Sequence, residues 1–252
     1  MILHVAMEAL LWGRKLQKFT WNVNCSKFVL NRFHDSLKST DEMDCRTYGR
    51  EEYENNVLEG MKSMKTKRLR ILFIGNSHTY YNDMPSMVKR RFDEEGCDCE
   101  VTMLAHPGWF LAQHVEEPDV RFNIRFGDYD YVVLQEHAHP FGPEEKFFEA
   151  VRTLTSWSRE AGSTPVIYMT WAKKTEPEMQ RRMTEAHTKI AEETGALLAP
   201  VGREWWGYKD SWPDLEMYAE DGQHASPAGS DFAAKLIWDT IQTDIERKNC
   251  GR

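Results

Sequence analysis

Short apolar runs alternate with amphipathic stretches from residue 70 almost to the C-terminus. Five of these runs predict strands, at residues 71–74, 100–104, 131–134, 165–170 and 196–201. The third run is apolar at every position, which is typical of a strand covered on both faces. Helical patterns lie between and after the runs, from about residue 85 and at residues 143–161, 176–194 and 227–244. This alternation predicts a three-layer α/β/α sandwich with a mainly parallel five-stranded sheet.

Proline marks the start of two of these helices. Pro85 suits a first helical turn, and either Asn82 or Asp83 is expected to cap that helix. Ser226 followed by Pro227 predicts a capped start for the last helix.

The first 68 residues differ in character from the rest. They carry a net charge of +3, against −11 for residues 69–252, and show little periodicity beyond a short helix near residues 8–19. We therefore predict an N-terminal extension, 1–68, and a globular α/β domain, 69–252. Two interpretations of the extension stay open: a small helical segment packed on the domain, or a misassigned start, with synthesis beginning at Met61 or Met64.

The composition of the chain indicates which kinds of binding partner and which cellular compartment to expect. The chain of 252 residues has a net charge of −8, which argues against nucleic acid or an anionic membrane as a partner. It has no apolar run of roughly 18 residues, and its start lacks the basic region of a signal peptide. The five cysteines are irregularly spaced, which favours free thiols. We predict a cytoplasmic protein.

Residues capable of nucleophilic chemistry follow the predicted strands. Ser77 comes just after the first strand, and the pair Asp221 and His224 precedes the last helix. Ligands bind beyond the carboxyl ends of parallel strands, so we expect these side chains to lie close together. A serine hydroxyl is a weak nucleophile at neutral pH and needs a base such as His224, which Asp221 would hold in one tautomer.

Three groups at the same edge are candidates for an oxyanion hole. They are the backbone N–H groups of Ser77 and Gly108 and the side-chain amide of Gln135. A preorganised donor of this kind contributes roughly 2.7–4 kcal/mol to transition-state stabilisation. Each residue alone is an ordinary turn or strand-end residue, and it is their order on successive strand ends that indicates an active site.

These blocks resemble the SGNH/GDSL hydrolase superfamily of esterases and lipases over about residues 70–245. Gly75-Asn76-Ser77 is similar to its first block, Gly108 to its second-block glycine, and Asp221 with His224 to its final block. The usual third block, Gly-x-Asn-Asp, is replaced by Gln135-Glu136, a pair similar to one in carbohydrate O-acetylesterases. The resemblance implies the flavodoxin-like topology of the SGNH hydrolase fold. It also implies a Ser-His-Asp mechanism through an acyl-enzyme, with no metal and no cofactor. It implies a small-molecule ester substrate, with O-acetyl groups on carbohydrate ahead of lipids or thioesters.

Residues beside these blocks are candidates for substrate binding. They are Asn76, His78, Trp109, Glu136, His137 and Trp171. Flat aromatic rings at a pocket mouth suit stacking on sugar faces. An equally good interpretation of the tryptophans, including Trp205, Trp206 and Trp212 in predicted loops, is that they cover the edge of the core.

Two other functions fit parts of the same pattern. His137-x-His139 has a spacing that metals use, and Glu136 and Asp221 could complete a site in a metal-dependent hydrolase. A non-catalytic carbohydrate-binding domain would keep the pocket without the chemistry. The joint presence of Ser77, Asp221 and His224 favours the serine hydrolase.

Overall fold

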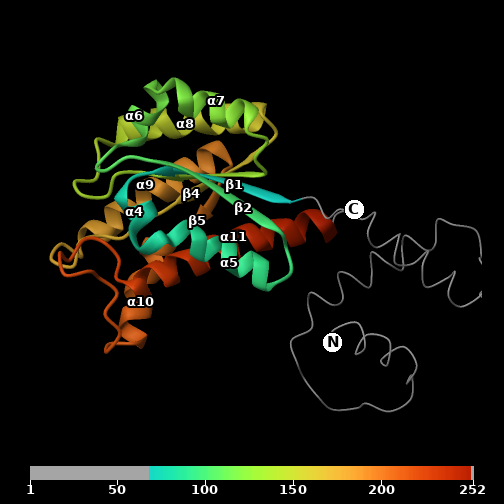
Figure 1. The fold of residues 1–252 in the computed structure, drawn as a ribbon. Helices are drawn as coiled ribbons and strands as arrows, with labels where there is room; N and C mark the ends of the chain where they lie inside the picture. Colours follow the sequence, from blue (N-terminus) through green and yellow to red (C-terminus); the bar gives the residue numbers. More distant parts are fainter. Residues whose placement is uncertain (1–67, 251–252) are drawn as a thin grey trace, which may run out of the picture. The chain divides into compact units, whose positions relative to one another are not determined.

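The computed structural model of the protein describes residues 68–250 (Figure 1). The expected helix near residues 8–19 and the alternative starts at Met61 and Met64 lie outside the described residues. The boundary at residue 68 stays a prediction.

A single five-stranded parallel sheet forms the middle layer, in the order β2-β1-β3-β4-β5. This is the flavodoxin-like order expected from the sequence. The strands are β1 (Leu69–Gly75), β2 (Cys99–Ala105), β3 (Tyr131–Gln135), β4 (Thr164–Tyr168) and β5 (Leu197–Ala199). The fifth strand is shorter than predicted because Pro200 follows it and α10 (Val201–Ser211) begins at once.

Helices cover both faces of the sheet, which confirms the three layers (Figure 1). On one face lie α5 (Met84–Glu94) and α11 (Pro227–Cys250). On the other lie α6 (Leu111–Glu116), α7 (Pro118–Phe126), α8 (Glu144–Glu160) and α9 (Met179–Thr194). Within residues 68–250, none of the helices combines the length and apolarity that crossing a bilayer requires.

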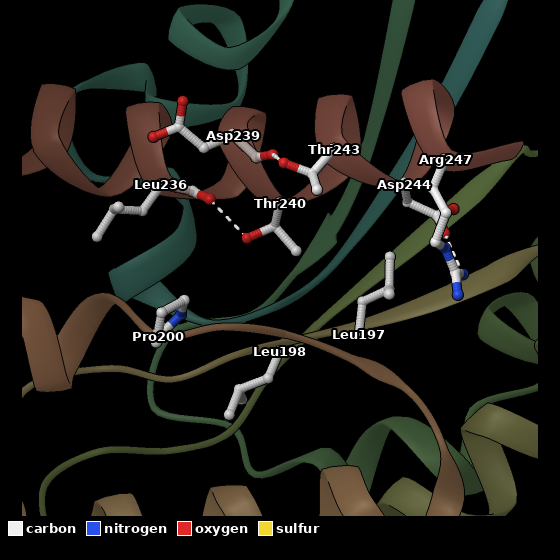
Figure 2. A pocket seen from close by; sticks show the side chains of 9 residues that line it. All are labelled: Leu197, Leu198, Pro200, Leu236, Asp239, Thr240, Thr243, Asp244 and Arg247. Carbon is white, nitrogen blue, oxygen red and sulfur yellow. Dashed lines mark hydrogen bonds and ion pairs between the residues drawn. The ribbon is translucent and has the colours of Figure 1, made fainter. Parts of the chain in front are cut away.

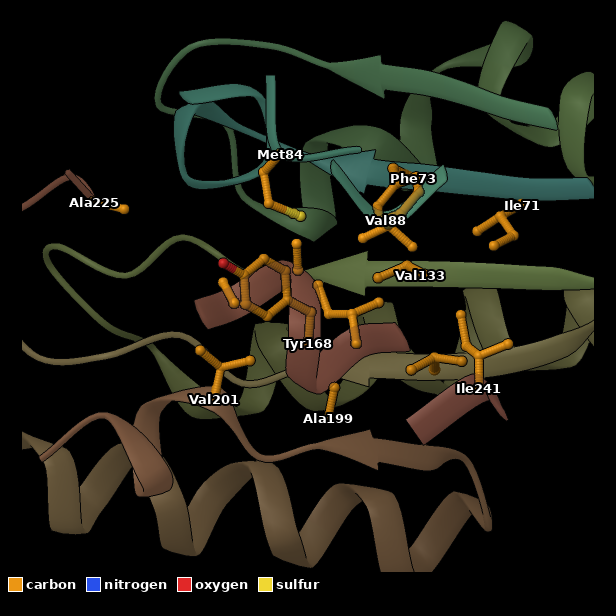
Figure 3. Close-up of a cluster of buried hydrophobic side chains, with 14 of the residues drawn as sticks. Ile71, Phe73, Met84, Val88, Val133, Tyr168, Ala199, Val201, Ala225 and Ile241 are labelled. Carbon is orange, nitrogen blue, oxygen red and sulfur yellow. The ribbon is translucent and has the colours of Figure 1, made fainter. Parts of the chain in front are cut away.

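Alternate strand residues build two cores, one on each side of the sheet. Ile71 and Phe73 of β1 point toward Val88 of α5 and Ile241 of α11 (Figure 3). The intervening Leu72 of β1 packs in the opposite core with α7, α8 and α9. This alternation follows from the period of two in a strand, and it makes the sheet a rigid base for the loops at its carboxyl edge.

The start of α11 is as predicted, but that of α5 is not. The Ser226 hydroxyl accepts a hydrogen bond from the Gly229 N–H at 3.1 Å, and Pro227 is the first helical residue. In α5, Pro85 lies in the first turn, but the preceding Asp83 makes no side-chain capping bond. The Asn82 amide is directed elsewhere, to α11 and the segment before it.

Periodicity did not predict four helices. They are α4 (Ser77–Tyr80), α6, α7 and α10. Trp205 and Trp206, placed in a loop by the sequence analysis, lie in α10, and Trp205 is fully buried. These tryptophans therefore belong to the packed part of the domain.

Candidate active site

Ser77 is the first residue of α4, and only Asn76 separates it from the end of β1 at Gly75. The Asn76 side chain caps this short helix, its Oδ1 accepting from the His78 N–H at 3.0 Å. The Asn76 Nδ2 donates to the Trp109 carbonyl oxygen at 2.9 Å, which ties the serine turn to the loop after β2. Asn76 is 1% exposed, so the structure corrects its assignment to substrate binding: its amide holds the turn.

Ser77, His224 and Asp221 form one chain of hydrogen bonds. The His224 Nε2 lies 2.7 Å from the Ser77 hydroxyl, and its Nδ1 lies 2.5 Å from the Asp221 Oδ2. The other Asp221 oxygen accepts from the N–H groups of Gln223 and His224, both at 2.9 Å. The structure thus brings together the three residues predicted to be catalytic.

The surroundings of Asp221 keep it ionised. Partial burial raises the pKa of this carboxyl, but hydrogen bonds from the His224 ring and from the N–H groups of Gln223 and His224 outweigh it and lower the pKa to about 2. A carboxylate on Nδ1 favours the tautomer with the proton on that nitrogen. The Nε2 lone pair then faces the Ser77 hydroxyl, as a general base requires.

Gly108 lies in the loop after β2 with φ +70°, a left-handed conformation that glycine adopts without strain. Among the described residues, neither the Gly108 N–H nor the Ser77 N–H donates to another protein group. Both therefore stay candidates for oxyanion donors.

Gln135, the last residue of β3, is not available as the third donor. Its Oε1 accepts from the Asn76 N–H at 2.8 Å and from the Thr79 hydroxyl at 2.9 Å, and its Nε2 donates to the Glu136 carbonyl oxygen. Gln135 is 1% exposed. The oxyanion assignment of this side chain is therefore wrong in this structure, because buried donors in the serine turn need an acceptor and Gln135 supplies it.

Glu136 is also an internal brace rather than a substrate contact. It is 2% exposed, and its carboxyl accepts from the N–H groups of His137 at 2.6 Å and Leu111 at 3.3 Å. Burial raises the pKa of this carboxyl to about 8. Its bonds join the loop after β3 to the start of α6.

The ring of His137, next to Glu136, is half-buried and stacks on the ring of Phe110, with centroids 4.3 Å apart. His137 therefore stays a candidate substrate contact at the rim of the site.

Two uncharged imidazoles lie next to His224. The His78 ring centroid is 4.9 Å from that of His224 and 5.2 Å from that of His139. Burial, reinforced by the neighbouring histidines, holds the pKa of His78 well below its usual value. Burial and then Lys173 lower the pKa of His139 to about 4. The Nε2 atoms of His78 and His139 are buried and have no partner within the described residues.

The two predicted tryptophan contacts differ. Trp171 is fully buried and stacks on Trp205 at 3.9 Å, so its assignment to substrate binding is wrong. Its Nε1 instead donates to the Gln223 carbonyl oxygen at 2.9 Å, which positions the loop that carries His224. Trp109 is half-buried beside His106 and stays a candidate contact at the rim.

Three of the four groups named for a metal site, all except His139, are engaged in other bonds. Glu136 accepts two backbone N–H bonds, Asp221 binds His224, and the His137 Nδ1 lies 3.1 Å from the Pro140 carbonyl oxygen. Among residues 68–250, no group of three or more His, Cys, Asp or Glu side chains is placed to hold a metal ion. The geometry therefore favours the serine chemistry over the metal-dependent alternative.

The sequence analysis missed two residues at the site. The Thr79 hydroxyl anchors the serine turn to Gln135. Tyr81 stacks on the His224 ring, with centroids 4.1 Å apart and planes 11° apart. No local signal in the sequence marks this contact, because it joins two segments that lie far apart along the chain.

A cavity of about 380 Å³ lies elsewhere, between β5 and α11 (Figure 2). It is lined by Leu197, Leu198, Pro200, Leu236, Asp239, Thr240, Thr243, Asp244 and Arg247. None of these residues belongs to the Ser77 site, so this cavity takes no part in the chemistry considered below.

No protein-family model matches the chain, and no curated protein matches it significantly. Solved structures do match. A carbohydrate esterase of family 3 from Talaromyces cellulolyticus superposes with a TM-score of 0.59 at 12% identity, over 71% of this chain and 99% of that one. A peptidoglycan O-acetylesterase gives 0.59 at 10% identity, over 76% and 95%. The esterase EstA from Pseudoalteromonas sp. gives 0.52 at 15% identity, over 70% and 98%.

The described domain has the SGNH hydrolase fold. Similarity at these identities concerns the fold. Within that SGNH fold, Ser77, Gly108 and the Asp221–His224 pair lie where the sequence resemblance expected them, at the carboxyl edge of the sheet. The third block departs from the expectation, because Gln135 and Glu136 are internal anchors.

Proposed function

We propose that the protein is a serine hydrolase of small acyl esters, acting through an acyl-enzyme on Ser77. The observation that carries this proposal is the continuous hydrogen-bond chain from the Ser77 hydroxyl through His224 to Asp221. Acyl transfer requires a nucleophile, a base and a group that orients the base. Ser77, His224 and Asp221 would fill these roles in that order.

The proposed reaction has two halves. The Ser77 oxygen attacks the ester carbonyl carbon while its proton passes to the His224 Nε2, and the carbonyl π electrons move to oxygen. The N–H groups of Ser77 and Gly108 would bind this oxyanion. When the tetrahedral intermediate collapses, the carbon–oxygen bond to the alcohol breaks and His224 protonates the departing oxygen. Water, activated by His224, then attacks the acyl-enzyme and releases the acid and Ser77.

O-acetyl groups on carbohydrate are the proposed substrate class. Two of the similar structures are a carbohydrate esterase and a peptidoglycan O-acetylesterase. Trp109 and His137 at the rim would contact the sugar.

Hydrolysis of p-nitrophenyl acetate and butyrate by the wild type and Ser77→Ala, with and without EDTA, tests the proposal. We expect activity that EDTA leaves intact, that Ser77→Ala abolishes and that is greater on acetate. Release of acetate from an acetylated xylan would support the carbohydrate substrate. Activity that survives Ser77→Ala but falls with EDTA would favour the metal-dependent alternative, and sugar binding without turnover would favour a binding domain.

We also propose that the catalytic domain spans residues 69–252 and acts in the cytoplasm without nucleic-acid or membrane partners. The thiols of Cys99 and Cys250 are free, which is in keeping with a reducing compartment.

A further inference from the structure

The turn that follows α4 has an unusual backbone. Asn82 and Asp83, in the 3-10 turn η1 (Tyr81–Asp83), have φ values of 54° and 57°. Two consecutive non-glycine residues in the left-handed region cost conformational energy. Such strain persists where surrounding contacts impose it, and it gathers at functional sites.

The contacts that impose this turn come from the segment carrying the catalytic imidazole. The Asn82 Nδ2 donates to the Ala225 carbonyl oxygen and to the Ser230 hydroxyl, both at 2.9 Å. The Ser230 hydroxyl in turn donates to the Tyr81 carbonyl oxygen at 3.3 Å. Ala225 directly follows His224. The strained turn is therefore fixed relative to His224, although Asn82 and Ala225 lie 143 positions apart in the sequence.

The result of this anchoring is the position of the Tyr81 ring. It lies parallel to the His224 imidazole, with centroids 4.1 Å apart and planes 11° apart. Tyr81 is 36% exposed, so it is not simply part of the core. Parallel stacking limits rotation of the imidazole about the Cβ–Cγ bond of His224. This keeps Nδ1 directed toward Asp221 and Nε2 toward Ser77.

We propose that Tyr81 is a positioning residue for the general base, and that its ring face stabilises the imidazolium formed when His224 accepts the Ser77 proton. Asp221 stabilises the positive charge of the imidazolium at its Nδ1 edge. Tyr81 stabilises the same charge over the ring plane, where an aromatic quadrupole attracts a cation. The inference rests on the Ser77 mechanism proposed above. The strained turn at Asn82 and Asp83 is the device that sets the geometry.

Two substitutions of Tyr81 test this role by hydrolysis of p-nitrophenyl acetate. Tyr81→Leu removes the ring, and we expect kcat to fall ~5- to ~30-fold with KM within about twofold of the wild type. Tyr81→Phe keeps the ring and should keep kcat within about twofold. Phe122→Leu, at a 65% exposed position on α7, is the control and should leave both constants unchanged.

A spectroscopic readout separates positioning from general stability. The His224 Nδ1 proton bound to Asp221 should give a downfield proton NMR signal in the wild type and Tyr81→Phe, and the signal should broaden or vanish in Tyr81→Leu. If Tyr81→Leu unfolds, Asn82→Gly serves as the test instead. Glycine adopts the left-handed φ at this position, but it lacks the amide that bonds to Ala225 and Ser230. We expect this variant to show the same fall in kcat.

Three results bear on the inference differently. An unchanged kcat and an unchanged signal in Tyr81→Leu would overturn it. A raised KM at constant kcat would also overturn it, because Tyr81 would then be a substrate contact. A wild type that neither hydrolyses esters nor reacts with a fluorophosphonate would refute the proposed function instead, and the NMR signal would still decide whether Tyr81 orients His224.

Discussion

The substitution Gln135→Leu distinguishes between two roles for the Gln135 side chain, that of an internal anchor and that of an oxyanion donor. The substitution leaves two buried donors without an acceptor, the Asn76 N–H and the Thr79 hydroxyl, which now bond to the Gln135 Oε1 at 2.8 and 2.9 Å. Each unpaired buried donor costs about 1–3 kcal/mol. After allowance for the apolar surface that leucine buries, we expect the free energy of unfolding to fall by ~2–5 kcal/mol.

Urea unfolding of the wild type and Gln135→Leu measures this loss, and Thr79→Val is the matched comparison. Thr79→Val removes one hydroxyl and leaves the Gln135 Oε1 with the Asn76 N–H, so it should cost only ~0.5–1.5 kcal/mol. Hydrolysis of p-nitrophenyl acetate is followed in parallel. An oxyanion donor, by contrast, contributes a factor of about 10²–10³ to kcat. A Gln135→Leu variant as stable as the wild type, with kcat reduced by that factor, would refute the anchor interpretation.

Two further predictions concern carboxyl groups. Asp221→Asn should lower kcat ~10²- to ~10⁴-fold through loss of the correct His224 tautomer. The pKa of the Asp221 carboxyl, about 2, lies below its unfolded value, so its stabilisation is present above about pH 4 and is lost as pH falls toward 2; urea midpoints should converge with those of Asp221→Asn across that range. For Glu136, a folded pKa of about 8 has the opposite consequence, because the folded state holds a proton that the unfolded state releases. Wild-type stability should therefore fall relative to Glu136→Gln as pH rises from about 4.5 to 8, and a constant difference would contradict the raised pKa.

The sheet and the grouping of Ser77, Asp221 and His224 could be predicted because their signals are local. Runs such as Tyr131–Leu134 indicate buried strands without knowledge of their neighbours. Parallel topology then brings Ser77 and the Asp221–His224 pair to one edge, where they form the expected hydrogen bonds.

The remaining features depend on contacts that the sequence does not display. Gln135 was assigned as a donor because nothing in the sequence shows that the Asn76 N–H and the Thr79 hydroxyl are buried and need its oxygen. Helix α4 has four residues, too few for a periodic pattern. The position of Tyr81 follows from a turn whose φ values are imposed by bonds to α11 and the segment before it.

The central claim is that Ser77 is a nucleophile activated by His224. Mass spectrometry of the full chain after treatment with a fluorophosphonate, followed by peptide mapping, tests it without reference to any particular ester. We expect one phosphonyl group on Ser77 in the wild type and a rate of labelling at least ~100-fold lower in His224→Ala. An adduct on another residue, or equal labelling of Ser77 in the two proteins, would contradict the account.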